Sequence, residues 1–141
     1  MLVLCLSLYA AAPAVSVVYS NEQLDFRNED QDVLLLSFEI DNPNEIDFTL
    51  ELKFENNCAF KKKRGKTTFS LSSIKWRENG NSELIEIWDL PQICEHISFP
   101  INFTDKKSFY SLELLGSWGK GGDKLTAGAY KETVSFTISV P

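Results

Sequence analysis

The side chains best suited to chemistry lie mid-chain: two cysteines and the single histidine, Cys58, Cys94 and His96. They could supply three zinc ligands, but no fourth ligand is evident and a Cys-x-His spacing is unusual for zinc. Two cysteines in an exported protein more often form a disulfide bond, with the histidine as a bystander. We therefore predict a disulfide between Cys58 and Cys94 and no metal site.

Carboxylates are the second group with catalytic potential. A glycosidase on a β-sandwich needs two carboxylates that face each other across a sheet. The candidates in the strand-like segments are Glu51, Glu55, Glu83, Glu86 and Glu113. Outward-facing positions on strands explain all of them, and the local sequence suggests no nucleophile elbow and no Ser–His–acid set. We predict that the chain is not an enzyme and needs no cofactor.

A glycine-rich loop follows Trp118 and offers a possible ligand contact. Residues 119–123 (GKGGD) lack the Gly-Lys-Ser/Thr ending of a phosphate loop, and no helix follows, so a flexible loop between strands is the better interpretation. An exposed Trp118 could stack on a sugar ring, as could Trp76 or Trp88. The alternative for Trp118 is a lid over the core.

Two further motifs belong on the surface. The basic run Lys61–Lys66 (KKKRGK) reads as the tip of a long hairpin, and such a run is usually a solvated loop. The alternative for this run is a contact with an anion or a glycan. Asn102-Phe103-Thr104 is a glycosylation sequon, which matters only in a eukaryotic secretory pathway.

The composition is that of one folded, acidic domain. The 141 residues are 43% hydrophobic and 12% aromatic, which is enough for a domain with its own core. The net charge is −6, and a negative surface repels phosphate backbones. We therefore predict no nucleic-acid partner.

The N-terminal segment has the pattern of an export signal. Residues 1–18 carry no charge, and an apolar run is followed by the small residues Ala12 and Ala14, which match an A-x-A cleavage site. We predict a signal peptide over 1–14, which would remove Cys5 and leave two cysteines. A buried N-terminal strand is the alternative. A stable membrane span is not expected, because the apolar run is shorter than the ~20 residues needed and Pro13 interrupts it.

The rest of the chain, residues 15–141, reads as strands. In the closing strand, Val134, Phe136, Ile138 and Val140 alternate with polar residues, which is typical of a strand with one face in a core. The same period recurs upstream at Leu34, Leu36, Phe38 and Ile40, at Phe48, Leu50, Leu52 and Phe54, at Ile97, Phe99, Ile101 and Phe103, and at Tyr110, Leu112 and Leu114.

Turn residues separate these runs. Residues 41–44 (DNPN) and 78–81 (ENGN) are turn sequences, and Asn-Gly favours a tight type I′ hairpin. Residues 67–76 read as one strand that slips near Ser72-Ser73, where we expect a bulge, and Pro100 indicates an edge position or a bulge. The count is about eight strands and no amphipathic helix. The prediction is a single all-β domain, a two-sheet antiparallel sandwich.

The closing segment, residues 125–140 (LTAGAYKETVSFTISV), resembles the last strand of bacterial pilin-like sandwich proteins. The nearest are the spore coat protein U family and the chaperone–usher pilin superfamily. The positions that match are Ala127, Gly128, Tyr130, Val134, Phe136, Thr137 and Ile138. The resemblance implies an immunoglobulin-like fold, export, and assembly into surface structures by exchange of a strand. Pilin subunits, however, place their cysteine pair across the first two strands.

Two functions follow as hypotheses. The first is an exported, non-enzymatic β-sandwich that acts as a pilin-like structural or adhesive subunit, in the periplasm, at the cell surface or as a secreted protein, with protein partners or by self-assembly. The second is a secreted module that binds carbohydrate or another ligand, with Trp118 as the contact. A hydrolase on the same scaffold would require a cleft with two facing carboxylates.

Overall fold

The computed structural model describes residues 1–7, 13–25, 27–28, 30–56, 58–64, 68–89, 97–119 and 130–141. Every regular element in these ranges is a strand. The strands are β1 (Leu2–Ser7), β2 (Ala14–Ser20), β3 (Val33–Asp41), β4 (Phe48–Phe54), β5 (Ala59–Lys62), β6 (Thr68–Ser70), β7 (Ser73–Glu78), β8 (Ile85–Asp89), β9 (Ile97–Phe103), β10 (Phe109–Ser117), β11 (Tyr130–Lys131) and β12 (Thr133–Ser139). The described part contains no helix long and apolar enough to cross a membrane.

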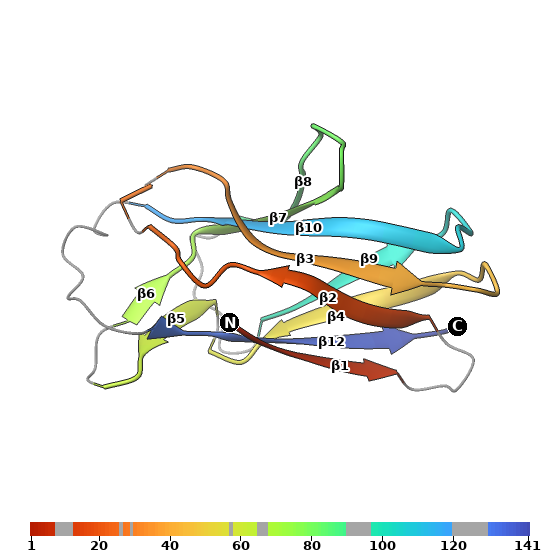
Figure 1. Cartoon of the computed structure of the whole chain (residues 1–141), viewed down its shortest axis with the longest axis horizontal. Helices are drawn as coiled ribbons and strands as arrows, with labels where there is room; N and C mark the ends of the chain where they lie inside the picture. Colours follow the sequence, from red (N-terminus) through yellow and green to blue (C-terminus); the bar gives the residue numbers. More distant parts are fainter. Residues whose placement is uncertain are drawn as a thin grey trace.

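The strands form a sandwich-like structure with a small extra sheet at one end (Figure 1). One main sheet, here called the β12 sheet, has the order β1-β12-β4-β9, and the other, the β10 sheet, has the order β2-β3-β10-β7-β8. The small sheet has the order β11-β5-β6 and lies at the end of the sandwich away from the C-terminus. The prediction of an all-β sandwich is thus confirmed at the level of two stacked main sheets.

The prediction that both sheets are antiparallel is wrong for the β12 sheet. β1 pairs with β12 in parallel, from Leu2 opposite Thr133 to Ser7 opposite Ile138. The remaining pairs of this sheet, β12 with β4 and β4 with β9, are antiparallel. The expected number of about eight strands was too low, since the described residues form twelve. Residues 1–14 were left outside the domain, β5 was not expected, and the predicted strand 67–76 and the closing segment are each divided in two.

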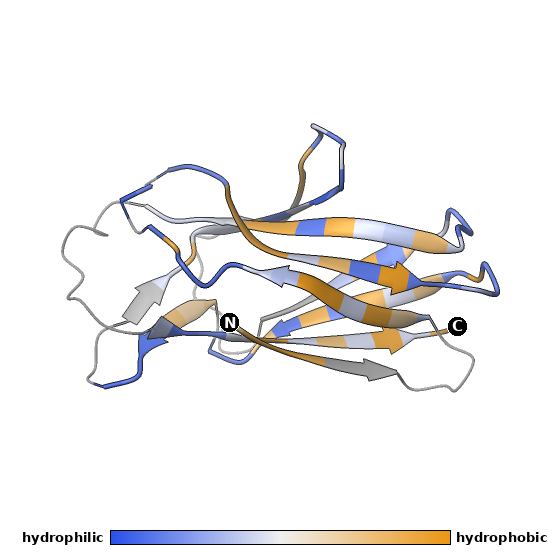
Figure 2. Ribbon diagram, viewed as in Figure 1, coloured by the Kyte–Doolittle hydropathy of each residue, from blue (hydrophilic) through white to orange (hydrophobic). Residues whose placement is uncertain are grey.

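The alternating side chains meet between the two main sheets, as predicted. Val134, Phe136 and Ile138 on β12 are at most 1% exposed. The ring of Phe136 lies 4.9 Å from that of Phe38, which belongs to β3 in the facing sheet. Figure 2 shows the apolar residues alternating along the central strands. The hydrophobic effect therefore acts across the layers, and β12 supplies a central part of the core.

Aromatic rings extend this core toward the C-terminal end of the sandwich. Phe48 of β4 stacks on Phe103 of β9, with ring centroids 4.8 Å apart. Tyr110 of β10 meets both rings edge-on, at 5.8 Å and 4.9 Å. Edge-to-face packing of this kind adds to the free energy gained from burial alone.

We expected a bulge near Ser72-Ser73, where the alternation of apolar residues in 67–76 is interrupted. The structure shows that the chain passes from one sheet to another at this point. The predicted strand 67–76 is split into β6 in the small sheet and β7 in the β10 sheet. At the crossing, the Leu71 N–H donates to the Cys58 carbonyl and the Ser72 N–H donates to the Ser117 carbonyl, each over 2.8 Å. Leu71 thus bonds to the residue before β5 and Ser72 bonds to β10, which breaks the period of two.

The edge and turn predictions have mixed outcomes. Pro100 lies exposed on β9, which is an edge strand, as predicted. The turn at 78–81 is present, and Gly80 has a φ of +87°, a conformation that favours glycine. The first pairs of the hairpin join Trp76 to Ile85, so its loop is longer than the two-residue type I′ turn that we expected.

Among the described glycines, Gly116 on β10 has the least room for a side chain. A Cβ at this position would lie 2.9 Å from Leu35 Cδ1 and 3.1 Å from Leu71 Cδ2, and both leucines are buried. We expect Gly116→Ala to lower the free energy of unfolding by about 1–3 kcal/mol through overpacking. Chemical denaturation measures this. Gly119→Ala is the matched control, because its Cβ would meet nothing within 4 Å; equal losses in both variants would contradict the account.

Candidate functional site

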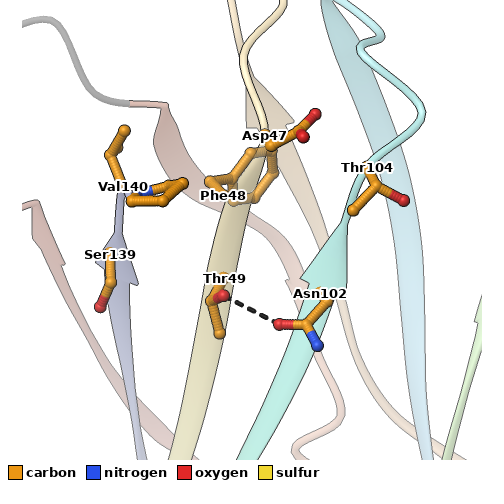
Figure 3. Close-up of a pocket in the computed structure, with 8 residues that line it drawn as sticks. Asp47, Phe48, Thr49, Asn102, Thr104, Ser139 and Val140 are labelled. Atoms are coloured by element: carbon orange, nitrogen blue, oxygen red, sulfur yellow. Dashed lines mark hydrogen bonds between the residues drawn. The ribbon is translucent and has the colours of Figure 1, made fainter.

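An open pocket of about 360 Å³ lies at the C-terminal end of the β12 sheet, where β4 begins and where β9 and β12 end (Figure 3). Its lining residues are Asp47, Phe48, Thr49, Asn102, Thr104, Ser139, Val140 and Pro141. The three strands place these residues side by side because β12, β4 and β9 are consecutive in the sheet. Four of the lining residues lie on these strands and the other four directly flank the strand ends, and most of the side chains are polar.

The polar groups of the pocket are arranged for hydrogen bonding. Thr49 Oγ1 donates to Asn102 Oδ1 over 2.9 Å, and the Asn102 amide nitrogen points away from Thr49 (Figure 3). Asp47 Oδ1 is buried and has no hydrogen-bond partner among the described residues. Asp47 supplies the acidic side chain among the described lining residues. The pocket can therefore offer hydrogen bonds to a small polar ligand.

The glycosylation sequon lies at the same pocket. Asn102 and Thr104 are both exposed, at the end of the edge strand β9. The intervening Phe103 points into the core and is 5% exposed. The strand's alternation thus presents both polar residues of the sequon on the surface, and glycosylation would still require a eukaryotic secretory pathway.

A second unusual group is a buried carboxyl at the junction of β11 and β12. Glu132 is fully buried, with 0% of the residue exposed. Its Oε1 accepts hydrogen bonds from the Thr133 N–H over 2.6 Å and the Asn56 N–H over 3.0 Å. Its Oε2 is buried and has no partner among the described residues. The carboxyl therefore ties β12 to the turn that follows β4.

Burial raises the pKa of Glu132 above its ordinary value, because a charged carboxylate loses its hydration inside the protein. The N–H donors of Thr133, Asn56 and Ala59, with the Asn56 side chain, oppose this and lower the pKa. The sequence interpretation missed Glu132. A signal was available, since the period of two that includes Val134 and Phe136 also places residue 132 on the buried face.

The structure does not support the predicted ligand contact at Trp118. Trp118 is 0% exposed, so its ring has no face open to a sugar. It is instead among the largest fully buried side chains, as in the alternative of a core lid. Trp76 is half-buried, with its ring 6.0 Å from that of Phe103. The side chain of Trp88 lies outside the described residues.

The predicted disulfide between Cys58 and Cys94 stays a prediction. Cys58 is buried at the start of the small sheet, and no disulfide joins cysteines within the described part of the chain. Cys94 and His96 both lie outside the described residues. Within the described ranges, no three His, Cys, Asp or Glu side chains are grouped so that they could hold a metal ion.

The acidic residues that were considered for catalysis occupy separate surface positions. Glu51, Glu55 and Glu83 are exposed, and Glu113 pairs with Arg77 over 3.3 Å. The side chain of Glu86 lies outside the described residues. Outward-facing positions on strands and turns thus account for the four described glutamates.

Comparison with known proteins gives no assignment: no family model, no curated protein and no solved structure matches this chain. The function has to be inferred from the arrangement of its own residues.

Proposed function

We propose that the mature protein is an exported, non-enzymatic subunit of a cell-surface structure, with an immunoglobulin-like sandwich that a strand from another polypeptide completes. The observation that carries this proposal is the parallel pairing of β1 with β12. β1 lies wholly within residues 1–14, the segment predicted to be removed on export. The strand that closes one edge of the sandwich is therefore one that the mature protein would lack.

The contacts of β1 indicate what its removal would uncover. Met1 and Val3 are half-buried and pack against the hydrophobic core, whereas Leu2 and Leu4 are 48% and 47% exposed. The Leu2 N–H also donates to the Glu132 carbonyl over 3.4 Å. Without β1, the backbone groups of β12 on that side would be unpaired and part of the core would face water. Such an edge is a template for pairing with another chain.

A replacement strand would bind by β-strand addition. Main-chain hydrogen bonds would supply affinity, and apolar side chains at alternate positions would fill the places of Met1 and Val3. The resemblance of the C-terminal segment to pilin-like proteins, in which strand exchange joins subunits, supports the same interpretation. The donor strand would come from a partner in the assembly, because residues 14–20 are already used in β2.

We expect a peptide of residues 1–7, with Cys5 replaced by serine, to stabilise a protein that starts at residue 15. A peptide that binds the folded state at 100 times its Kd adds about 2.7 kcal/mol to the free energy of unfolding. Thermal unfolding with and without the peptide measures this. The peptide carrying Val3→Asp should fail, because Val3 packs on the core, and the peptide carrying Leu4→Asp should work, because Leu4 is half-exposed.

Two results would contradict the proposal. One is a protein starting at residue 15 that melts at the temperature of the full chain and gains nothing from the peptide. The other is an intact mass showing that the exported protein retains Met1. The alternative of a carbohydrate-binding module loses Trp118 as a stacking contact, because Trp118 is buried.

A further inference from the structure

The small sheet gathers positive charge from two distant parts of the chain. In its register, Lys131 of β11 lies opposite Lys61 of β5, and Lys61 lies opposite Thr68 of β6. Lys63 and Arg64 follow β5 directly. Lys61 and Lys131 share one side of the sheet, and Lys63 and Arg64 lie in the bend that follows β5. All four are exposed, and we call these four residues the basic face. The hydrophilic end of β5 and the residues after it are blue in Figure 2.

The positive charges of the basic face repel one another, and no ion pair with a described carboxylate neutralises them. Like charges directly opposite each other on neighbouring strands are destabilising. The ion pairs found among the described residues involve other cations, namely the N-terminal amine, Arg27, Lys75, Arg77 and Lys107. A pair of lysines held opposite each other, with no ion pair to a described carboxylate, is suited to binding an external anion.

The charge of the remaining chain restricts what kind of anion can approach. Lys61–Arg64 and Lys131 are five of the fourteen basic residues. The other nine stand against twenty acidic residues, which leaves a net charge of −11 for the rest of the chain. A flat anionic membrane or a nucleic-acid duplex would extend beyond this sheet and approach the negatively charged rest of the protein. Within the Debye length of about 8 Å, the two negative surfaces would repel each other. A flexible linear polyanion can touch the basic face alone.

The other side of the small sheet is where its aromatic residues lie. Phe60 is 4% exposed, and Tyr130, which lies opposite Lys62, is half-buried. Because strand residues alternate between faces, Lys61 and Lys131 are on the side opposite Phe60 and Tyr130. Among its described residues, the basic face therefore has no ring on which a nucleobase could stack, and stacking is the main source of single-strand nucleic-acid affinity.

We propose that the basic face binds a linear acidic polysaccharide. The ammonium groups of Lys61, Lys63 and Lys131 and the guanidinium of Arg64 would pair with carboxylate or sulfate groups along the polymer. The proposal does not depend on strand completion at β12, because none of the four residues lies in β1 or β12. Failure of one proposal would leave the other standing.

Binding of the full chain to labelled polygalacturonate and heparin tests this proposal. We expect binding at about 50 mM NaCl that weakens strongly at about 300 mM NaCl. Lys131→Glu should reduce the affinity about tenfold through charge reversal at the face. The same change places a carboxylate opposite Lys61, so the melting temperature should stay the same or rise. Weaker binding without loss of stability separates recognition from a folding defect.

Lys53→Glu is the matched control, because Lys53 is exposed on β4 in the β12 sheet and its reversal changes the net charge equally. It should leave the affinity within about a factor of two. The proposal is overturned if neither polysaccharide binds, or if Lys53→Glu and Lys131→Glu weaken binding equally. It is also overturned if a thymidine oligonucleotide or phosphatidylglycerol vesicles bind more tightly than both polysaccharides.

Discussion

Replacing Phe136 by alanine is expected to lower the free energy of unfolding by about 3–5 kcal/mol. Phe136 is 0% exposed at the middle of β12, and its ring lies 4.9 Å from that of Phe38 in the facing sheet. Its loss would remove a contact that joins the two layers and would leave a cavity that the packed strands fill only in part. Urea denaturation of the full chain measures the change.

The neighbouring Ser135 provides the control for Phe136. Ser135 is half-buried on the other side of β12, opposite Lys53 of β4 and Leu4 of β1. We expect Ser135→Ala to change the free energy of unfolding by no more than about 0.5 kcal/mol. A loss below about 1 kcal/mol for Phe136→Ala would show that β12 is not part of a packed inter-sheet core.

The second large effect is a pH dependence that comes from Glu132. Its folded pKa is raised above the ordinary value of 4.5, so the folded state holds a proton that the unfolded state releases. The stabilising contribution of the neutral carboxyl is complete below about pH 4.5 and is lost as the pH rises through the folded pKa. Within that window the free energy of unfolding falls by about 1.4 kcal/mol per pH unit.

Glu132→Gln should remove this slope, because the amide is neutral at every pH in the window and its oxygen can still accept from Asn56 and Thr133. The free energy of unfolding is measured from about pH 4 to about pH 8 for the wild type and for Glu132→Gln. The difference between the two curves isolates the contribution of Glu132. Glu55→Gln is the control, since Glu55 is exposed in the turn after β4. Parallel pH curves for the wild type and Glu132→Gln would refute the assignment.

The sequence alone predicted the strands whose alternation is simple. The β4 residues Phe48, Leu50, Leu52 and Phe54 are all buried, as are Val134, Phe136 and Ile138 on β12. A period of two is enough in these cases because one face meets the core and the other does not. The edge position of Pro100 followed for a similar local reason, namely that proline cannot donate to a ladder.

The signal peptide over residues 1–14 stays a prediction, because an apolar segment such as Leu2–Leu6 suits a signal peptide and a strand equally. The failures have physical causes as well. Leu35 and Leu36 are both buried because the register of β3 against β10 shifts between Leu114 and Leu115. Such a bulge has no strong residue signature. Trp118 was judged from its glycine-rich neighbourhood, whereas its burial depends on distant strands.

Glu132 and the basic face illustrate a further limit. The pairing of Lys131 with Lys61 joins residues 70 positions apart, through a register that no local pattern determines. The predicted hairpin is confirmed, since β5 and β6 pair antiparallel. Lys61 and Lys62 lie in β5 and not at the tip, and residues 65–67 lie outside the described residues. What the sequence could not show is that a second basic strand adds to that hairpin.

Hydrogen exchange along β12 tests the central proposal most directly. In the full chain, all the β12 amides that bond to β1 or β4 should be protected. In a protein that starts at residue 15, the amides facing β1 should exchange rapidly while those facing β4 stay slow, and the peptide of residues 1–7 should restore protection. Slow exchange of every β12 amide in the shortened protein, with no change on adding the peptide, would contradict the idea that this edge awaits a strand.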